Sequence, residues 1–158
     1  MIENKSGNAE IVVWDNKYLT GIDIIDAQHK QLIVLTNKLF EACLTNEDVL
    51  QTVFKEAMSS MVLYVRSHFE FELKILQLIN YPDYPNHKKQ HDSLIKDILA
   101  AVKNYNEGKK FVPNHFVRTL RDWIITHIAV YDKKYSVYAW EQVKKGILTE
   151  KTLKEINA

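Results

Sequence analysis

Residues that end helices are scarce along most of this chain. Only four glycines and three prolines occur in 158 residues, and they leave three uninterrupted stretches, at 22–81, 86–107 and 114–145. Because glycine and proline are the commonest helix breakers, stretches of this length permit long helices. The first stretch is too long for one ordinary helix, and residues 44–48 form the natural place to divide it. The sequence therefore predicts four long helices.

Apolar residues within these stretches recur at steps of three and four, which is the spacing of one helix face. In the first helix the stripe runs through Ile22, Ile25, His29, Leu32, Thr36, Leu39 and Cys43. No segment alternates with a period of two for long enough to compete as a strand. Short connections make consecutive helices antiparallel, so we expect an all-α fold, an antiparallel up-down-up-down four-helix bundle.

We expect a single domain over residues 1–158. Its parts are an extended N-terminal lead segment at 1–20, the bundle at about 22–138 and a C-terminal extension at 139–158. In the lead segment, Trp14 and Tyr18 are predicted to pack onto the bundle. In the extension, Thr149 is predicted to cap a short final helix.

The composition excludes several partners. Lysine and arginine number 21 against 20 aspartates and glutamates, so the chain lacks the basic footprint that nucleic-acid binding needs. The longest apolar runs have five residues, far short of the ~20 that a spanning helix needs, so we expect no membrane partner. The N-terminus carries no secretory signal pattern, and the single cysteine, Cys43, cannot form an internal disulfide. We therefore expect a cytoplasmic protein, and the sequence identifies no protein partner.

Several polar side chains fall on helix faces that should point into the bundle. They are His29, His68, Glu72, His87, His91 and His127. A buried carboxylate or imidazole is costly unless it is paired or bound to a metal. Each histidine alone is more simply explained as a core histidine with a hydrogen-bond partner. Their conjunction favours a metal site, because residues four apart share a helix face and up-down connectivity brings these positions toward one end of the bundle.

The types of these side chains narrow the choice of metal. Imidazole and carboxylate without thiolate suit iron, copper, nickel, manganese or zinc, and they argue against an iron–sulfur cluster. Five histidines together with Glu72 exceed what one tetrahedral or octahedral ion takes. The pattern therefore indicates two ions.

The addition of Asp132 completes a family pattern. In order and spacing, the chain resembles the hemerythrin family, most like its free-standing bacterial members, through the motifs His29, His68-x-x-x-Glu72, His87-x-x-x-His91 and His127-x-x-x-x-Asp132. Flanking residues match as well, including Gly21-Ile22-Asp23-x-x-Asp26-x-Gln28-His29-Lys30, Tyr81-Pro82 and Asp132-x-x-Tyr135. The resemblance runs from about Trp14 to about Tyr138.

The resemblance implies a non-haem di-iron centre and assigns its ligands. The ligands of one iron would be His87, His91 and His127, and those of the other would be His29 and His68. Glu72 and Asp132 would bridge both ions, together with an oxo or hydroxo group. Counting these ligands leaves the second iron one open position, at which dioxygen would bind.

The resemblance further implies a dioxygen carrier and not an enzyme. Such a protein binds dioxygen reversibly, for storage or for delivery to oxygen-requiring enzymes. The side chains that would line its apolar pocket are Leu32, Phe69, Trp123 and Ile124, which plain core packing explains equally well. Two other functions stay open: an oxygen or redox sensing module, and a di-iron enzyme such as a peroxidase, an oxidase or a protein that handles iron or nitric oxide.

The spacing between His127 and Asp132 poses a geometric problem. Residues five apart differ by about 140° around an ideal α-helix, so a regular helix would aim the two side chains differently. We therefore predict a π-type widening or a local distortion between them, as is common at functional sites.

Five other residues complete the predictions. Leu73 and Leu76 stand where the family often has an acidic residue and a methionine. His115 lies outside every pair and is predicted at the surface. Cys43 is predicted as a small core residue, and Tyr135 either covers the site or belongs to the core.

Overall fold

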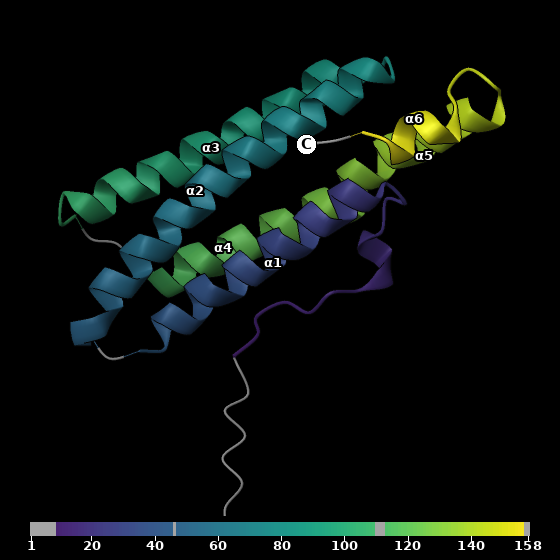
Figure 1. Ribbon diagram of the computed structural model, residues 1–158. Coiled ribbons are helices and arrows are strands. Elements are labelled where there is room, and N and C mark those ends of the chain that lie inside the picture. Colours follow the sequence, from purple (N-terminus) through teal and green to yellow (C-terminus); the bar gives the residue numbers. More distant parts are fainter. Residues whose placement is uncertain (1–8, 46, 110–112, 157–158) are drawn as a thin grey trace, which may run out of the picture.

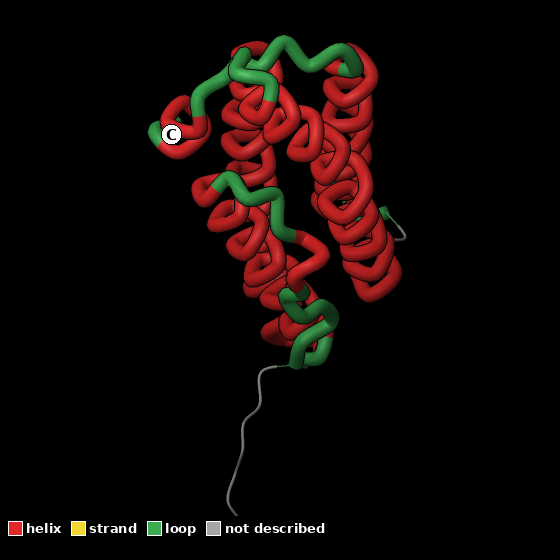
Figure 2. Tube along the Cα trace, turned by 90° about the vertical axis from the view of Figure 1, so that its right-hand side faces the viewer, coloured by secondary structure: helices red, strands yellow, loops and turns green. Residues whose placement is uncertain are grey.

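Four long helices make up the computed structural model, which describes residues 9–45, 47–109 and 113–156. The first three are α1 (Asp23–Cys43), α2 (Glu47–Leu78) and α3 (Tyr84–Asn106). The fourth begins as α4 (Pro113–Thr126), widens into a π-helical segment (His127–Asp132) and continues as α5 (Lys133–Lys144). The described part of the chain contains no strand (Figure 2). The predicted all-α four-helix bundle is confirmed.

The helices pack in two layers (Figure 1). One layer holds α2 and α3, the other holds α1 and α4, and neighbouring helices run antiparallel. The turn between α2 and α3 follows from local chemistry. Asn80 takes a left-handed φ of 51°, and the amide of Tyr81 closes the end of α2 on the carbonyl of Leu76 at 2.9 Å. Pro85 then stands in the first turn of α3, where its missing amide hydrogen costs nothing.

Two apolar clusters flank a polar layer inside the bundle. The larger cluster includes Leu39, Phe54, Met61, Ile98 and Leu120. The smaller cluster, at the other end, includes Ile25, Ile75, Leu76, Tyr135 and Ala139. Along α1, His29 lies between Ile25 of the smaller cluster and Leu32 of the larger one. Burial of each large apolar side chain contributes about 1.5–3 kcal/mol, so the two clusters hold the helices in register around the polar layer.

The N-terminal lead segment is a loop with one 3-10 turn, η1 (Asn16–Tyr18). Tyr18 is buried, and the Trp14 ring packs edge-on against it with the ring centres 5.6 Å apart. Both rings belong to the larger cluster or pack against it, as predicted. The amide of Asn37 in α1 fastens the loop, because its oxygen accepts from the backbone of Val12 and its nitrogen donates to the Val12 carbonyl.

The C-terminal residues fold back toward the start of α1. After α5 ends at Lys144, the chain turns at Gly146 and forms α6 (Glu150–Lys154). The hydroxyl of Thr149 accepts a 3.0 Å hydrogen bond from the amide of Thr152, so the predicted cap of a short final helix is confirmed. Leu153 of α6 is buried in the smaller cluster.

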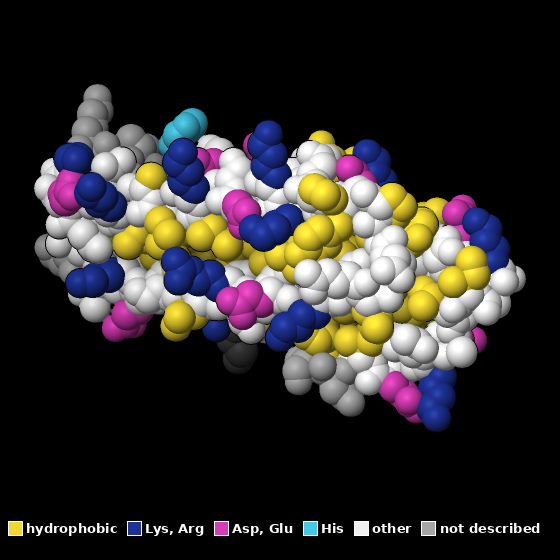
Figure 3. All heavy atoms as spheres, turned by 90° about the horizontal axis from the view of Figure 1, so that it is seen from above, with side chains coloured by type: hydrophobic (Ala, Val, Ile, Leu, Met, Phe, Trp, Pro, Cys, Tyr) yellow, Lys and Arg dark blue, Asp and Glu magenta, His cyan; other side chains and the backbone are white. Residues whose placement is uncertain are grey.

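Figure 3 shows the face that α2 and α3 form, with apolar side chains in a band between lysine, arginine and acidic side chains. Val62 of α2 and Ile95 and Leu99 of α3 line a shallow hollow on this seam. The described helices include none with the length and apolarity of a membrane span.

Candidate metal centre

The polar layer brings together seven side chains from all four long helices. They are His29 from α1, His68 and Glu72 from α2, His87 and His91 from α3, and His127 and Asp132 from the π-helical segment. Each is at most 4% exposed. These are the seven residues that the sequence motifs indicate, and the structure brings all of them to one place.

The seven side chains form two overlapping groups whose possible ligand atoms lie within 4.8 Å of one another. The first group consists of Glu72, His87, His91, His127 and Asp132, and the second of His29, His68 and Glu72. Glu72 belongs to both groups. Its Oε2 lies 3.0 Å from Nε2 of His91, and its Oε1 lies 3.8 Å from Nε2 of His29.

Asp132 also faces both groups. Its Oδ1 lies 3.0 Å from Nε2 of His127 and 3.4 Å from Nε2 of His87. Its other oxygen, Oδ2, lies 3.1 Å from Nε2 of His29. Asp132 reaches this position because residues 127–132 form a π-helix, and the predicted widening is confirmed. The wider turn aims Asp132 and His127 at the same point despite their five-residue spacing.

The buried polar atoms of this layer fit a metal better than a hydrogen-bond network. Nε2 of His29 and both oxygens of Asp132 are buried without a hydrogen bond, although His29 and Asp132 approach to 3.1 Å. An unpaired buried carboxylate is costly. Two ligands that bind one ion at about 2.1 Å and at right angles lie roughly 3 Å apart without any hydrogen bond between them. The ring nitrogens Nε2 of His91 and His127, which lie 3.0 Å apart, also fit this spacing.

Electrostatics keep the ring of His68 neutral and the two carboxylates of the layer ionised. Burial lowers the pKa of His68 to about 3, so its ring is neutral at pH 7. Burial alone would raise the pKa of Glu72, but hydrogen bonds from His87 and His91 outweigh it and hold that pKa well below its usual range. Burial and the neighbouring Glu72 likewise oppose ionisation of Asp132, yet His127 and His29 lower its pKa.

Two residues outside the layer orient its members. Oε1 of Gln28 lies 2.8 Å from Nδ1 of His68, so a proton on Nδ1 leaves Nε2 of His68 free to bind a metal. The hydroxyl of Tyr135 donates a 2.6 Å hydrogen bond to Oε1 of Glu72. Burial and then the charge of Glu72 raise the pKa of Tyr135 well above its usual value, so this hydroxyl stays protonated. Tyr135 thus both belongs to the core and contacts the site.

The sequence motifs do not predict the role of Gln28, which belongs only to the residues flanking His29. The available signal was its position directly before His29, which places a long amide on the side of α1 next to His68. Whether that amide meets His68 depends on how α1 and α2 pack. Spacing along one helix does not contain that information.

A small cavity adjoins the polar layer on the side of the larger apolar cluster. Its volume is about 10 Å³. The four predicted pocket residues, Leu32, Phe69, Trp123 and Ile124, all line it, together with His68, His127, Asp132 and other side chains. The Phe69 ring stacks on the imidazole of His91 with the ring centres 3.7 Å apart. The lining of the cavity is therefore almost wholly apolar, and the cavity borders the rings of His68 and His127.

Four further residues lie outside the polar layer. His115 is exposed at the start of α4, away from both groups. Cys43 is half-buried, packs against the larger cluster, and has its pKa raised by burial to about 11. Leu76 is fully buried in the smaller cluster and Leu73 packs against it. None of the four contributes to the two groups of candidate ligands among the described residues.

A comparison with protein families decides the relationship. The model of the hemerythrin HHE cation binding domain matches residues 20–138. The chain belongs to the hemerythrin family. Hemerythrins bind dioxygen and contain non-haem iron, and they are generally not enzymes. The predicted family is thereby confirmed.

Individual relatives agree with this assignment. A bacteriohemerythrin of Methylococcus capsulatus is 29% identical over 116 residues, which cover 73% of this chain and 86% of the relative. A bacteriohemerythrin of Stenotrophomonas maltophilia is 28% identical over 134 residues, covering 85% and 82%. A crystal structure of wild-type hemerythrin superimposes with a TM-score of 0.74 at 28% identity, covering 80% of this chain and 95% of that chain.

Proposed function

We propose that this hemerythrin binds dioxygen reversibly at a non-haem di-iron centre, for storage or for delivery to oxygen-requiring enzymes. One observation carries the proposal. Seven buried side chains form two overlapping groups that share Glu72, and Asp132 between them has two buried oxygens without a hydrogen bond. Two ions would bind to all of these ligand atoms, including the Asp132 oxygens. Without a metal, the unpaired buried polar groups would lower the stability of the fold.

The two groups support a division of the ligands. His87, His91 and His127 would hold one iron, and His29 and His68 would hold the other. Glu72 and Asp132 would bridge the pair, because each carboxylate lies within 4 Å of ring nitrogens from both sets. When bound, iron supplies reversible one-electron chemistry and an open coordination position for a diatomic gas. The protein supplies five imidazoles, two ionised carboxylates and their fixed orientation.

The surrounding residues suit carriage more than turnover. Leu32, Phe69, Trp123 and Ile124 line a cavity of about 10 Å³, which is about the space of one water molecule and excludes an organic substrate. Their apolar side chains also keep water and protons from the inner faces of the histidines. Tyr135 and Gln28 hold Glu72 and His68 in place through hydrogen bonds. We therefore infer that the protein is not an enzyme.

Repeated oxygenation tests the proposal. The iron-loaded protein is reduced without air, exposed to air, and then evacuated through several cycles while its visible absorption is recorded. Carriage requires that the oxygenated spectrum returns in each cycle with little loss. Rapid one-way conversion to an oxidised form in the first cycle would reject carriage and favour a sensor or a di-iron enzyme.

A further inference from the structure

A second hollow reaches the candidate metal centre from outside. It is a surface groove of about 440 Å³ whose aromatic walls are Trp123, His127 and Tyr131, with Gln90 and Asp122 beside them. Trp123 and His127 also line the small internal cavity. Nε2 of His127 faces Asp132 at 3.0 Å, so this one imidazole joins the groove to the ligand cluster.

The aromatic walls of the groove form a continuous stack. Trp123 lies over the imidazole of His127 with ring centres 4.3 Å apart and planes 10° apart. Tyr131, four residues after His127, has its ring centre 5.6 Å from that of His127, and the two ring planes are 29° apart. Trp123 and Tyr131 are partly exposed, whereas His127 is buried. The three rings thus connect solvent with a candidate ligand through π contacts alone.

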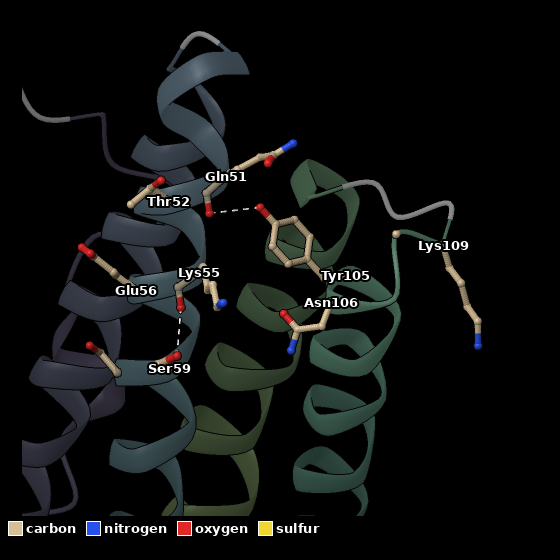
Figure 4. A pocket seen from close by; sticks show the side chains of 10 residues that line it. Gln51, Thr52, Lys55, Glu56, Ser59, Tyr105, Asn106 and Lys109 are labelled. Carbon is tan, nitrogen blue, oxygen red and sulfur yellow. Dashed lines mark hydrogen bonds between the residues drawn. The ribbon is translucent and has the colours of Figure 1, made fainter.

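A larger hollow of about 1010 Å³ offers no such connection. It lies at the opposite end of the bundle, between the first turns of α2 and the end of α3, and Figure 4 shows its side chains. Gln51, Lys55 and Glu56 are exposed there, and Tyr105 donates its hydroxyl to the Gln51 carbonyl at 3.1 Å. No candidate metal ligand lines it. This groove serves as a reference site for the experiments below.

The chemistry of the proposed function requires a route for electrons. An iron pair that binds dioxygen reversibly does so in its ferrous state, and each loss to the ferric state must be reversed by two electrons. The centre is enclosed, because all seven candidate ligands are at most 4% exposed. The stacked rings of Trp123, His127 and Tyr131 are a path through which these electrons can pass without any movement of the bundle.

We propose that the groove binds a reduced flavin, and that the stack of Trp123, His127 and Tyr131 passes its electrons to the metal centre; this proposal rests on the proposed function for the presence of iron. One dihydroflavin loses two electrons and two protons and becomes oxidised flavin. The electrons reduce two ferric ions to two ferrous ions, and the protons pass to solvent. The flavin is either free or carried by a protein.

The groove matches a flavin in size and chemistry. Its volume lies within the range of small-molecule sites, and its aromatic walls can stack on a flat ring system. Oε1 of Gln90 is buried without a hydrogen bond, and because Gln90 lines the groove, a turn of its amide would let this oxygen accept one from the imide N–H of a flavin. The ammonium of Lys134 lies 5.1 Å from the centre of the Tyr131 ring and can pair with a flavin phosphate. Asp122 is paired with Arg121 at 2.6 Å, which reduces its repulsion of that phosphate.

Binding of flavin mononucleotide to the metal-free protein tests the site independently of dioxygen. Quenching of the fluorescence of oxidised flavin mononucleotide, which has the same ring system, measures the Kd. Loss of an aromatic contact at the centre of a site costs more than 1 kcal/mol, so Tyr131→Leu should weaken binding by about tenfold. Tyr131→Phe keeps the ring and should bind as the wild type does. Tyr105→Leu removes a ring from the reference groove and should also leave the Kd unchanged. Absence of binding by the wild type, or an equal Kd for Tyr131→Leu, would overturn the proposal.

Reduction kinetics then test the path and identify the source of the flavin. The oxidised iron-loaded protein is mixed without air with photoreduced flavin mononucleotide, or with a reduced flavodoxin, and the loss of the ferric absorption is followed. Tyr131→Leu should slow reduction by at least one of these donors relative to Tyr105→Leu. The faster donor shows whether the flavin acts free or within a protein. Equal rates for both variants with both donors would reject the path, even if the wild type binds dioxygen reversibly.

Discussion

The hydroxyl of Tyr135 donates a 2.6 Å hydrogen bond to Oε1 of Glu72, the carboxylate that both groups of candidate ligands share. The bond joins α5 to α2 across the smaller apolar cluster, and both side chains are completely buried. A donor at this distance holds the carboxylate in one rotamer and keeps it ionised. The bond therefore couples the packing of the C-terminal half of the fourth helix to the geometry of the candidate metal centre.

Tyr135→Phe removes this hydroxyl and little else. Hydrogen bonds to charged groups contribute about 1.5–3 kcal/mol, so we expect the free energy of unfolding of the metal-free protein to fall by about that amount. Urea denaturation measures it. The control is Tyr138→Phe, whose hydroxyl donates to the Asn80 carbonyl at an exposed position, and it should cost less than 1 kcal/mol. Equal losses in the two variants would show that the bond to Glu72 carries no special weight.

Gln28→Ala should weaken iron binding while leaving the fold intact. The amide oxygen of Gln28 fixes the proton of His68 on Nδ1, and loss of such an outer partner lowers metal affinity by about 10–100-fold. Competition with a chelator of known affinity measures the effect. Gln77→Ala is the matched control, because the side-chain amide of Gln77 donates to the Tyr84 hydroxyl in an exposed hydrogen bond. An unchanged iron affinity in Gln28→Ala would mean that packing alone orients His68.

Substitutions of candidate ligands and of His115 test whether iron binding depends on the clustered residues or on any histidine. His87→Ala and Glu72→Ala each remove a buried member of the first group, and we expect a sharp loss of bound iron, measured by elemental analysis after reconstitution. We expect no loss in His115→Ala, because His115 is exposed and outside both groups. Bound metal stabilises only the folded state, so the wild type and His115→Ala should lose thermal stability when a chelator removes iron, whereas His87→Ala and Glu72→Ala should not. Equal iron loss in all three variants would contradict the assignment.

Much of the helix bundle can be predicted from local patterns in the sequence. Scarce glycine and proline and a three-four apolar spacing predict the helices, and short turns predict their antiparallel order. The convergence of the five histidines and Glu72 follows from their depth along antiparallel helices, whereas Asp132 was added through the family pattern. The π-helical widening follows from the spacing of His127 and Asp132. In a regular helix these two side chains would point about 140° apart and could not reach the same metal site.

Other features depend on contacts between helices and were not predicted. The hydrogen bond of Gln28 to His68 depends on the rotation of α1 against α2, and the choice of Tyr135 between core and site depends on where Glu72 points. The hydrogen bonds that hold residues 19–26 also depend on contacts distant in sequence. The Asp26 carboxylate accepts hydrogen bonds from the amide and the hydroxyl of Thr20 at 2.8 Å. The indole N–H of Trp140, 120 residues away, donates to the carbonyl of Thr20 at 3.0 Å.

Gly21 lies among these hydrogen-bonded residues and should tolerate no side chain. Its φ is +78°, a left-handed value, and a Cβ there would lie 3.0 Å from Nε1 of Trp140, which donates to the Thr20 carbonyl. Left-handed backbone costs an L-residue about 1–2 kcal/mol, and the contact with Trp140 adds to it. Gly108→Ala is the control, because Gly108 has a φ of +64° with open space around it. Thermal unfolding should place Gly21→Ala below Gly108→Ala, and the reverse order would contradict a tight approach of Trp140.

Cys43 should react slowly with alkylating agents in the folded protein. Burial raises the pKa of its thiol to about 11, so at pH 8 only about 0.1% is thiolate, whereas a free cysteine with a pKa near 8.5 is roughly one quarter thiolate. Because the thiolate is the nucleophile, the rate of modification by iodoacetamide should rise about tenfold per pH unit up to pH 11. Mass spectrometry of the intact protein measures the rate, and the urea-unfolded chain provides the control. A thiol of this kind also resists oxidation, which begins from the thiolate. A rate that levels off near pH 8.5 in the folded protein would show that Cys43 titrates as an exposed thiol.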